Sequence, residues 1–361
     1  MRAIIKSHRG ILLLACAVLL QAQAPPASER ARVMMEELRV QIGSPGLSAA
    51  VAVDGKIVWA EGFGLADAEN QVPVSPESRF RLGSISKLIT VAAAAKLVEA
   101  GKLDLDAPVQ RYVPSFPAKE QPITPRQLAG HLAGIRHYNL QDFSMPVRRY
   151  ERLTEGLEIF QNDPLVHAPG SAYLYSSYGY NLFGAVIEGA AGKDFGGAVD
   201  ELVIQPLGLK GTALDDPARI LERRVRFYRR EADGTLANEG AIDSSYKWPS
   251  AGYLSTASDL VRFGSAHMRD GFIKPETRSL LFTSQRTTAG VETGVGIGWR
   301  IGKDGAGRRF LHHGGAIDGG RAFILLYPDE KIAVAILANL SGARYAEGEA
   351  QKLAELFLET D

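Results

Sequence analysis

The chain has 361 residues, of which 45% are hydrophobic and 23% are charged, an ordinary composition for a globular protein. Lysine and arginine together number 41, as do aspartate and glutamate, so the formal net charge is zero. A nucleic-acid-binding protein would normally carry a basic excess, so the balanced charge argues against that class. The length suits one large domain or two modest ones.

The N-terminus has the pattern of an export signal. Basic residues precede an apolar stretch, residues 11–20, that is too short to span a bilayer comfortably as a helix. Ala22 and Ala24 then form the A-x-A pattern of a cleavage site. We therefore expect a signal peptide over 1–24 and an exported protein, periplasmic or secreted. Two alternatives stay open, namely lipidation at Cys16 and an uncleaved segment retained in the membrane.

Cysteine usage narrows the chemistry. Cys16 is the only cysteine in the sequence, and it falls within the predicted signal peptide. The mature chain would then contain no cysteine, which excludes both disulfides and a cysteine nucleophile.

The predicted elements begin with a helix over 27–43. Two β-rich runs, 47–53 and 56–62, flank Asp54-Gly55, and an Asp-Gly pair in that position is a strong hairpin signal. Residues 84–100 favour a helix. Helical segments broken by proline and glycine follow at 124–134, 145–161, 178–191, 195–204 and 256–270. Strand signals return at 298–301, 322–327 and 332–339, and a helix over 342–359 closes the chain.

This order predicts an α/β fold. Its antiparallel sheet would have about five strands drawn from opposite ends of the chain, flanked by the terminal helices. A mainly helical region would be inserted between the two halves of the sheet. We expect a single domain over 25–361, with residues 25–105 and 286–361 as the α/β part and residues 106–285 as the helical part.

Ser84 and Lys87 form an S-x-x-K pattern at the start of the predicted helix. Side chains at this spacing lie on one face of a helix. The positive end of the helix dipole would favour an alkoxide on Ser84 and, together with burial, disfavour a charged Lys87. A neutral lysine could then activate the serine as a nucleophile. In the alternative interpretation Ser84 caps the helix and Lys87 is solvated, but the alanine-rich, almost uncharged helix indicates burial.

A second pattern, Tyr175-Ser176-Ser177, precedes an apolar helical run. A tyrosine ahead of a helix start can bring its phenol to a serine nucleophile as a proton carrier. The alternative is a packing role, because Tyr173, Tyr175, Tyr178 and Tyr180 could form an aromatic cluster.

A third pattern, His312-His313-Gly314-Gly315, lies at a predicted strand end. The two glycines would let a substrate backbone approach closely, and their amides could face an oxyanion. A plain loop and metal ligation are the alternatives. The other histidines beyond residue 24 lack H-E-x-x-H or similar spacing, so we predict neither a metal nor a cofactor.

In this order the three patterns resemble the S-x-x-K, Y-x-N and K/H-T-G series of the serine β-lactamases and penicillin-binding proteins. Flanking stretches such as PGLSAAVAVDGKIVWAEGFGLADAEN and ITPRQLAGHLAGIRHY are similar to the class C-like, esterase-like branch. That branch includes the mitochondrial serine β-lactamase-like proteins and their bacterial relatives. The similarity runs from about residue 45 to 340. The resemblance implies a β-lactamase/transpeptidase-like fold and acyl-transfer chemistry.

The resemblance also implies a role for each catalytic residue. Ser84 would be the nucleophile and Lys87 its proton acceptor, while Tyr175 would assist the lysine and serve the leaving group or incoming water. His312 stands where the penicillin binders have lysine. Gly315, with the Ser84 amide, would form the oxyanion hole.

Two departures from the family pattern bear on the substrate. Ser177 replaces the usual asparagine and His313 replaces threonine, at positions that normally contact a β-lactam. We therefore expect a serine hydrolase of peptide, amide or ester bonds acting on a small molecule or peptide, ranked above a β-lactamase or D,D-carboxypeptidase. The alternative is a non-catalytic scaffold, filament-forming or sensor protein on the same fold. Assembly of the chain into an oligomer or filament, and its retention in the membrane through the N-terminus, stay open.

Overall fold

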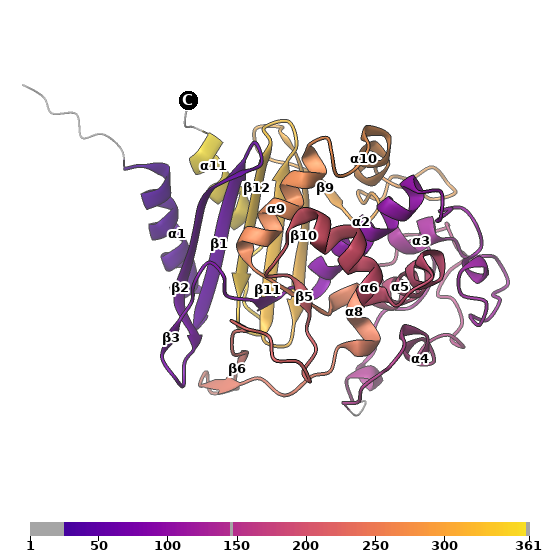
Figure 1. The fold of residues 1–361 in the computed structure, drawn as a ribbon, viewed down its shortest axis with the longest axis horizontal. Helices are drawn as coiled ribbons and strands as arrows, with labels where there is room; N and C mark the ends of the chain where they lie inside the picture. Colours follow the sequence, from indigo (N-terminus) through magenta and orange to yellow (C-terminus); the bar gives the residue numbers. More distant parts are fainter. Residues whose placement is uncertain (1–24, 145–146, 359–361) are drawn as a thin grey trace, which may run out of the picture.

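The computed structural model describes residues 25–144 and 147–358, so the predicted signal peptide lies outside the described residues. An antiparallel sheet of seven strands, in the order β3-β2-β1-β12-β11-β10-β9, forms its centre (Figure 1). One side contains β1 (Gly46–Val53), β2 (Lys56–Asp67) and β3 (Val72–Pro73). The other contains β9 (Arg300–Lys303), β10 (Arg309–Ile317), β11 (Gly320–Tyr327) and β12 (Ile332–Ala338). Because β1 pairs with β12, strands from the N-terminal and C-terminal parts of the chain are neighbours in the middle of the sheet.

The predicted α/β fold is confirmed, but the count of about five strands is wrong. The two strands that were not counted are β3, an edge strand of two residues, and β10, which carries the H-H-G-G pattern. The predicted hairpin joins β1 to β2, and its turn residues Asp54 and Gly55 have φ of 47° and 77°. Positive φ at both positions is the geometry for which an Asp-Gly pair is suited.

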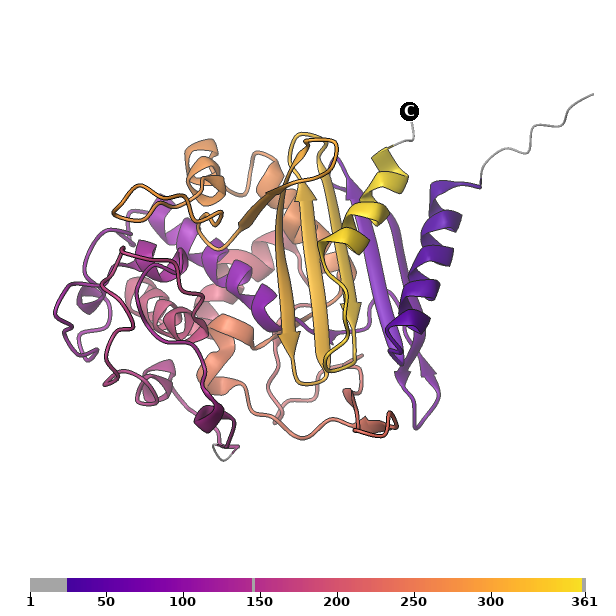
Figure 2. The same cartoon turned by 180° about the vertical axis from the view of Figure 1, so that it is seen from behind.

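Helices cover both faces of the sheet. α1 (Ala27–Gln41) and α11 (Glu347–Leu358) lie on one face (Figure 2) and share a core cluster with Leu47, Val51 and Ile336. On the other face, α9 (Ala257–Met268) packs against β1 and β12, within the core cluster that also contains α2 (Ser86–Glu99). With both faces covered, every residue of β12 is buried. This explains why its sequence is continuously apolar instead of alternating.

The segment between β3 and β9 is mainly helical. Its α-helices are α2 and α9, given above, together with α3 (Pro125–Ala129), α4 (Leu153–Leu157), α5 (Ser177–Ala191), α6 (Phe195–Val199), α7 (Gln205–Leu207), α8 (Trp248–Ala251) and α10 (Pro275–Phe282). The short 3-10 helices are η1 (Gly83–Ile85), η2 (Val109–Arg111), η3 (Leu140–Ser144) and η5 (Ser245–Lys247), and η4 (Asp200–Ile204) is a π-helix. Short strands are β4 (Phe80–Arg81), β5 (Ala213–Leu214), β6 (Tyr228–Arg230), β7 (Leu236–Asn238) and β8 (Tyr253–Ser255).

Three helix predictions are wrong in extent. The helix predicted over 124–134 is α3, which ends at Ala129 because His131, with a positive φ of 59°, cannot continue it. The helix predicted over 145–161 is reduced, in the described part of that range, to α4, and the preceding Tyr150 amide donates instead to Ser245 Oγ at 2.8 Å. The last helix begins at Glu347 and not at 342. The Glu349 carboxylate accepts the amide of Ala346, the residue just before the helix. Across the described ranges, no helix has the length and apolar character that a membrane span requires.

Candidate active site

Ser84 and Lys87 lie in one continuous helical segment, because η1 leads directly into α2. The Nζ atom of the fully buried Lys87 is within hydrogen-bond distance of Ser84 Oγ at 3.1 Å, of Ser177 Oγ at 3.1 Å and of the Ser250 carbonyl oxygen at 2.8 Å. Burial lowers the pKa of Lys87, Tyr175 acts in the opposite direction, and the charge of Arg300 lowers it further. The structure thus places Lys87 against Ser84 and away from solvent, and the environment favours the neutral amine.

Tyr175 completes the contacts of the serine oxygen. Its hydroxyl donates to Ser84 Oγ at 2.8 Å. Burial acts to raise the pKa of Tyr175, but Lys87, the contact with Ser84 and the charge of Arg300 outweigh it, so the pKa lies below the usual 10.0. One serine oxygen therefore lies between an amine and a phenol whose pKa values are both lowered.

The residues after Tyr175 start α5 and fix its position. Ser176 is the N-cap, and its hydroxyl accepts the Gly179 amide at 2.9 Å. Ser177, the first helical residue, is buried and accepts a hydrogen bond from Lys87. Ser177 was expected to contact substrate, whereas the structure uses its hydroxyl to hold the lysine.

The two adjacent histidines of β10 lie on opposite faces of the sheet, as neighbouring residues of a strand must. His313 is buried on the side of Ser84, with its ring centroid 6.4 Å from that of Tyr175. His312 faces the other way and stacks on Phe323 with centroids 5.6 Å apart. The prediction that His312 takes the position of the family lysine is therefore wrong, and His313 is the histidine beside the site.

Gly315 is required by the close approach of β10 to η1. A Cβ at Gly315 would lie 1.9 Å from the Leu82 carbonyl oxygen and 3.2 Å from the Ser84 amide nitrogen. A Cβ at Gly314 would instead meet the Phe323 ring at 3.4 Å, an ordinary contact on the opposite face. Gly315 thus provides clearance for the serine turn, and Gly314 lies outside the site.

The amide beside Ser84 belongs to Ala316. Ile317 pairs with Gly320 across a two-residue turn, so the Gly315 amide points toward β11 and the Ala316 amide points toward η1. A Cβ at Gly83 would lie only 2.8 Å from the Ala316 nitrogen. The amide that lies beside the Ser84 turn is therefore that of Ala316, and not that of Gly315 as the sequence predicted.

Two histidines for which the sequence predicted no catalytic role, His131 and His137, support the tyrosine segment. His131 Nδ1 accepts the Ser176 amide at 3.1 Å, and His137 Nδ1 accepts the Ser177 amide at 3.2 Å. The rings of His131 and Tyr175 lie 4.4 Å apart. Burial lowers the pKa of both histidines, which keeps the accepting nitrogens free of protons.

Arg300, at the start of β9, was also missed. Its guanidinium lies 5.5 Å from the centroid of the Tyr175 ring. It forms no hydrogen bond or ion pair with any residue of the described ranges. No local signal marks this arginine, because only the folding of β9 beside β10 brings it to Tyr175. Within residues 25–144 and 147–358, no three His, Cys, Asp or Glu side chains gather as a metal site would require.

This geometry, on this fold, defines a serine-hydrolase type of site. The profile of the Beta-lactamase family matches residues 31–357. The mitochondrial serine beta-lactamase-like protein of Homo sapiens is 32% identical, over 86% of this chain and 75% of that protein. Esterase EstB of Burkholderia gladioli is 30% identical, over 71% of this chain and 74% of the esterase. The octameric penicillin-binding protein homologue from Pyrococcus abyssi has a TM-score of 0.80 at 25% identity, covering 92% of this chain and 78% of that one.

The chain therefore belongs to the serine β-lactamase and penicillin-binding-protein family. Members of that family are serine hydrolases, as the esterase illustrates.

Proposed function

We propose that the protein hydrolyses ester, amide or peptide bonds through an acyl-enzyme on Ser84. The observation that carries this proposal is the position of Ser84 Oγ, which contacts both Lys87 Nζ at 3.1 Å and the Tyr175 hydroxyl at 2.8 Å. A serine hydroxyl becomes a strong nucleophile when such a base is adjacent.

The proposed reaction has two halves. In acylation, Ser84 Oγ attacks the substrate carbonyl carbon and its proton passes to Lys87 Nζ. The oxyanion that forms accepts hydrogen bonds from the Ser84 and Ala316 amides. Tyr175 relays the proton to the leaving group as the scissile bond breaks. In deacylation, water attacks the acyl carbon, gives a proton to the same groups, and Ser84 leaves with its hydroxyl restored.

Two observations support esters or small peptides over β-lactams as substrates. His313 stands near the position of the family cation, but burial lowers its pKa well below the usual 6.5, so it brings no positive charge for a β-lactam carboxylate. The Ser177 hydroxyl is engaged by Lys87. The similarity to an esterase points the same way.

The substrate ranking is tested with a panel of short-chain p-nitrophenyl esters, D-amino-acid peptides, penicillins and cephalosporins. We expect a higher kcat/KM for at least one ester or peptide than for any β-lactam. Cephalosporin hydrolysis near the usual ceiling of about 10⁸ M⁻¹s⁻¹ would reverse the ranking.

The catalytic roles are tested through Lys87→Ala and Tyr175→Phe. Each should lower kcat by about 10²–10⁴-fold with a modest change in KM. The two losses should not add, because the groups act on one oxygen as a unit. A Tyr175→Phe variant with full activity would remove the phenol from the mechanism.

The alternative, a non-catalytic scaffold with the same fold, predicts different results. The octameric homologue supports an assembly of several copies, which light scattering on the purified protein would measure. Assembly alone would not require a buried lysine against a serine, so a scaffold predicts no turnover and no effect of Lys87→Ala or Tyr175→Phe on the oligomer.

A further inference from the structure

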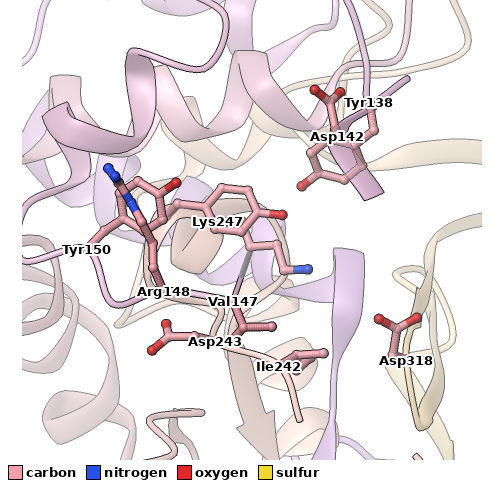
Figure 3. A pocket seen from close by; sticks show the side chains of 10 residues that line it. Tyr138, Asp142, Val147, Arg148, Tyr150, Ile242, Asp243, Lys247 and Asp318 are labelled. Carbon is pink, nitrogen blue, oxygen red and sulfur yellow. The ribbon is translucent and has the colours of Figure 1, made fainter. Parts of the chain in front are cut away.

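A charged pocket adjoins the candidate active site. Its lining consists of Tyr138, Asp142, Val147, Arg148 and Tyr150, of residues at and just before the turn η5, and of Asp318 in the β10–β11 turn, with about 700 Å³ of space including open solvent. Figure 3 shows Lys247 extending its ammonium toward the space between Tyr138 and Asp318. The aliphatic stem of Lys247 is part of the wall, and its ammonium lies 5.4 Å from the Tyr246 ring centroid.

Lys247 has no ionic or hydrogen-bonding partner for its charge among the described residues. Its ammonium makes no hydrogen bond or ion pair with any residue of the described ranges, and the same holds for the Asp318 carboxylate. Asp318 acts on Lys247 only through its field, which opposes the lowering of the Lys247 pKa by burial. A partly buried ammonium without a partner is unfavourable, and a charge-assisted hydrogen bond to an anion would relieve this.

Two of the carboxylates on the wall already have partners, and the second cation lies over an aromatic ring. Asp142 pairs with Arg136 at 2.7 Å. Asp243 accepts the Ser245 amide at 2.8 Å. Arg148 lies over the Tyr150 ring at 4.2 Å. Lys247 and the solvent-exposed Arg148 are thus the cations of this pocket whose donors are free for a ligand, and Lys247 is the more buried of the two.

The pocket is linked to the catalytic residues by one turn of chain. The Lys247 carbonyl accepts Ser250 Oγ at 3.2 Å, and the Ser250 carbonyl accepts Lys87 Nζ at 2.8 Å. Tyr138, which lines the pocket, reaches Ser250 Oγ at 3.4 Å. The lining contains neither Tyr175 nor a residue of β9. Because Tyr175 serves the leaving group in the proposed function, a pocket whose lining excludes Tyr175 is available to the acyl portion.

We propose that Lys247 binds a carboxylate on the acyl portion of the substrate, so that acyl groups ending in an anion are preferred. This inference rests on the proposed acylation of Ser84. Asp318 maintains the positive charge of Lys247 from a distance without occupying its donors. An anionic acyl chain would enter the pocket and complete the pair.

The test uses two esters of equal chain length, mono-p-nitrophenyl adipate and p-nitrophenyl hexanoate, which differ in the terminal carboxylate. Wild type should hydrolyse the adipate ester with the higher kcat/KM. Lys247→Met, which keeps the stem but removes the charge, should lower kcat/KM for the adipate ester by about 10- to 100-fold, the range for hydrogen bonds to charged groups. The hexanoate ester should be hydrolysed as by wild type, which also shows that the variant is folded.

Two further variants sharpen the result. Lys56→Met removes an exposed lysine from β2 and should change neither ester. Asp318→Asn removes the carboxylate whose field favours the charged form of Lys247 and should therefore lower the preference for adipate.

Equal losses on both esters in Lys247→Met, or no preference in wild type, would overturn the inference while leaving the proposed function intact. The same holds if neither ester is hydrolysed although a fluorophosphonate still labels Ser84. Absence of that labelling would overturn the proposed function as well.

Discussion

The guanidinium of Arg300 lies over the Tyr175 ring and lowers the pKa of both Tyr175 and Lys87. A positive charge disfavours the ammonium and favours the phenolate, so both groups release protons more readily. Because the proposed base is neutral Lys87, activity should fall as pH falls and this lysine becomes protonated. Arg300→Gln should raise the pKa of Lys87, move the acidic limb of the kcat/KM profile to higher pH and lower the rate at neutral pH.

The control for this prediction is Arg300→Lys, which keeps a positive charge and should keep the limb close to that of wild type. The profile is measured with p-nitrophenyl hexanoate from acid to mildly alkaline pH. A limb that stays in place in Arg300→Gln would show that this charge does not act on the base.

Individual residues differ in how far sequence alone can place them. Ser84 and Lys87 share one helical turn, so their contact follows from spacing. His312 and His313 are adjacent, and period-2 alternation shows that they face opposite ways without showing which one faces the site. Which histidine faces the site is set by the close packing of Gly315 against Leu82, a tertiary contact. Arg300 is far from Tyr175 in sequence, and no pattern could pair them.

At the scale of elements, the contact between β10 and η1 positions the serine. Gly315→Ala would place a methyl group 1.9 Å from the Leu82 carbonyl oxygen, so β10 or η1 must move. Overpacking of this kind costs about 1–3 kcal/mol of stability. Displacement of a catalytic group by about 1 Å can cost about 10²-fold in rate.

The matched control is Gly314→Ala, whose methyl group would meet the Phe323 ring at 3.4 Å. We expect slow fluorophosphonate labelling of Ser84 in Gly315→Ala and nearly wild-type labelling in Gly314→Ala. Equal labelling rates in the two variants would contradict the importance of this contact.

A second element, α9, carries a buried histidine in the core. Burial lowers the pKa of His267 to about 4, and its ring packs against Phe263, Phe272 and Trp299. The unfolded chain binds a proton at the ordinary pKa of about 6.5, so it gains protons before the folded chain does. The contribution of neutral His267 to the free energy of unfolding is thus fully present above pH 6.5 and is lost as pH falls toward 4.

His267→Phe should make the free energy of unfolding less sensitive to acid. The slope between those pH values should decrease by up to about 1.4 kcal/mol per pH unit, the value for one proton. Urea unfolding at a series of pH values measures it. An unchanged slope would mean that His267 takes up its proton in the folded state as readily as in the unfolded one.

The elements themselves were predicted with uneven success. The β1–β2 hairpin followed from Asp54-Gly55, and β12 from its apolar run. β10 has histidines and glycines in place of an apolar alternation, so its strand character comes from pairing with β11 and β9. The helix predicted over 145–161 failed because helical spacing competes there with tertiary contacts such as the one from Tyr150 to Ser245.

At the scale of the whole molecule, export remains a prediction about residues 1–24, which lie outside the described part of the chain. We propose that the protein is exported and that its mature N-terminus lies near Ala24 or Pro25. N-terminal sequencing of the protein from cell fractions measures this. A lipid-modified Cys16 would favour the lipoprotein alternative, and an intact Met1 would favour a retained segment.

The central claim is that Ser84 becomes acylated, and intact-protein mass spectrometry after treatment with a fluorophosphonate tests it most directly. Wild type should gain the mass of one adduct, located on the peptide that contains Ser84. Ser84→Ala removes one oxygen, should leave the fold unchanged and should gain no adduct. Stoichiometric labelling of Ser84→Ala, or a wild type that neither this reagent nor any substrate of the panel acylates, would contradict the account.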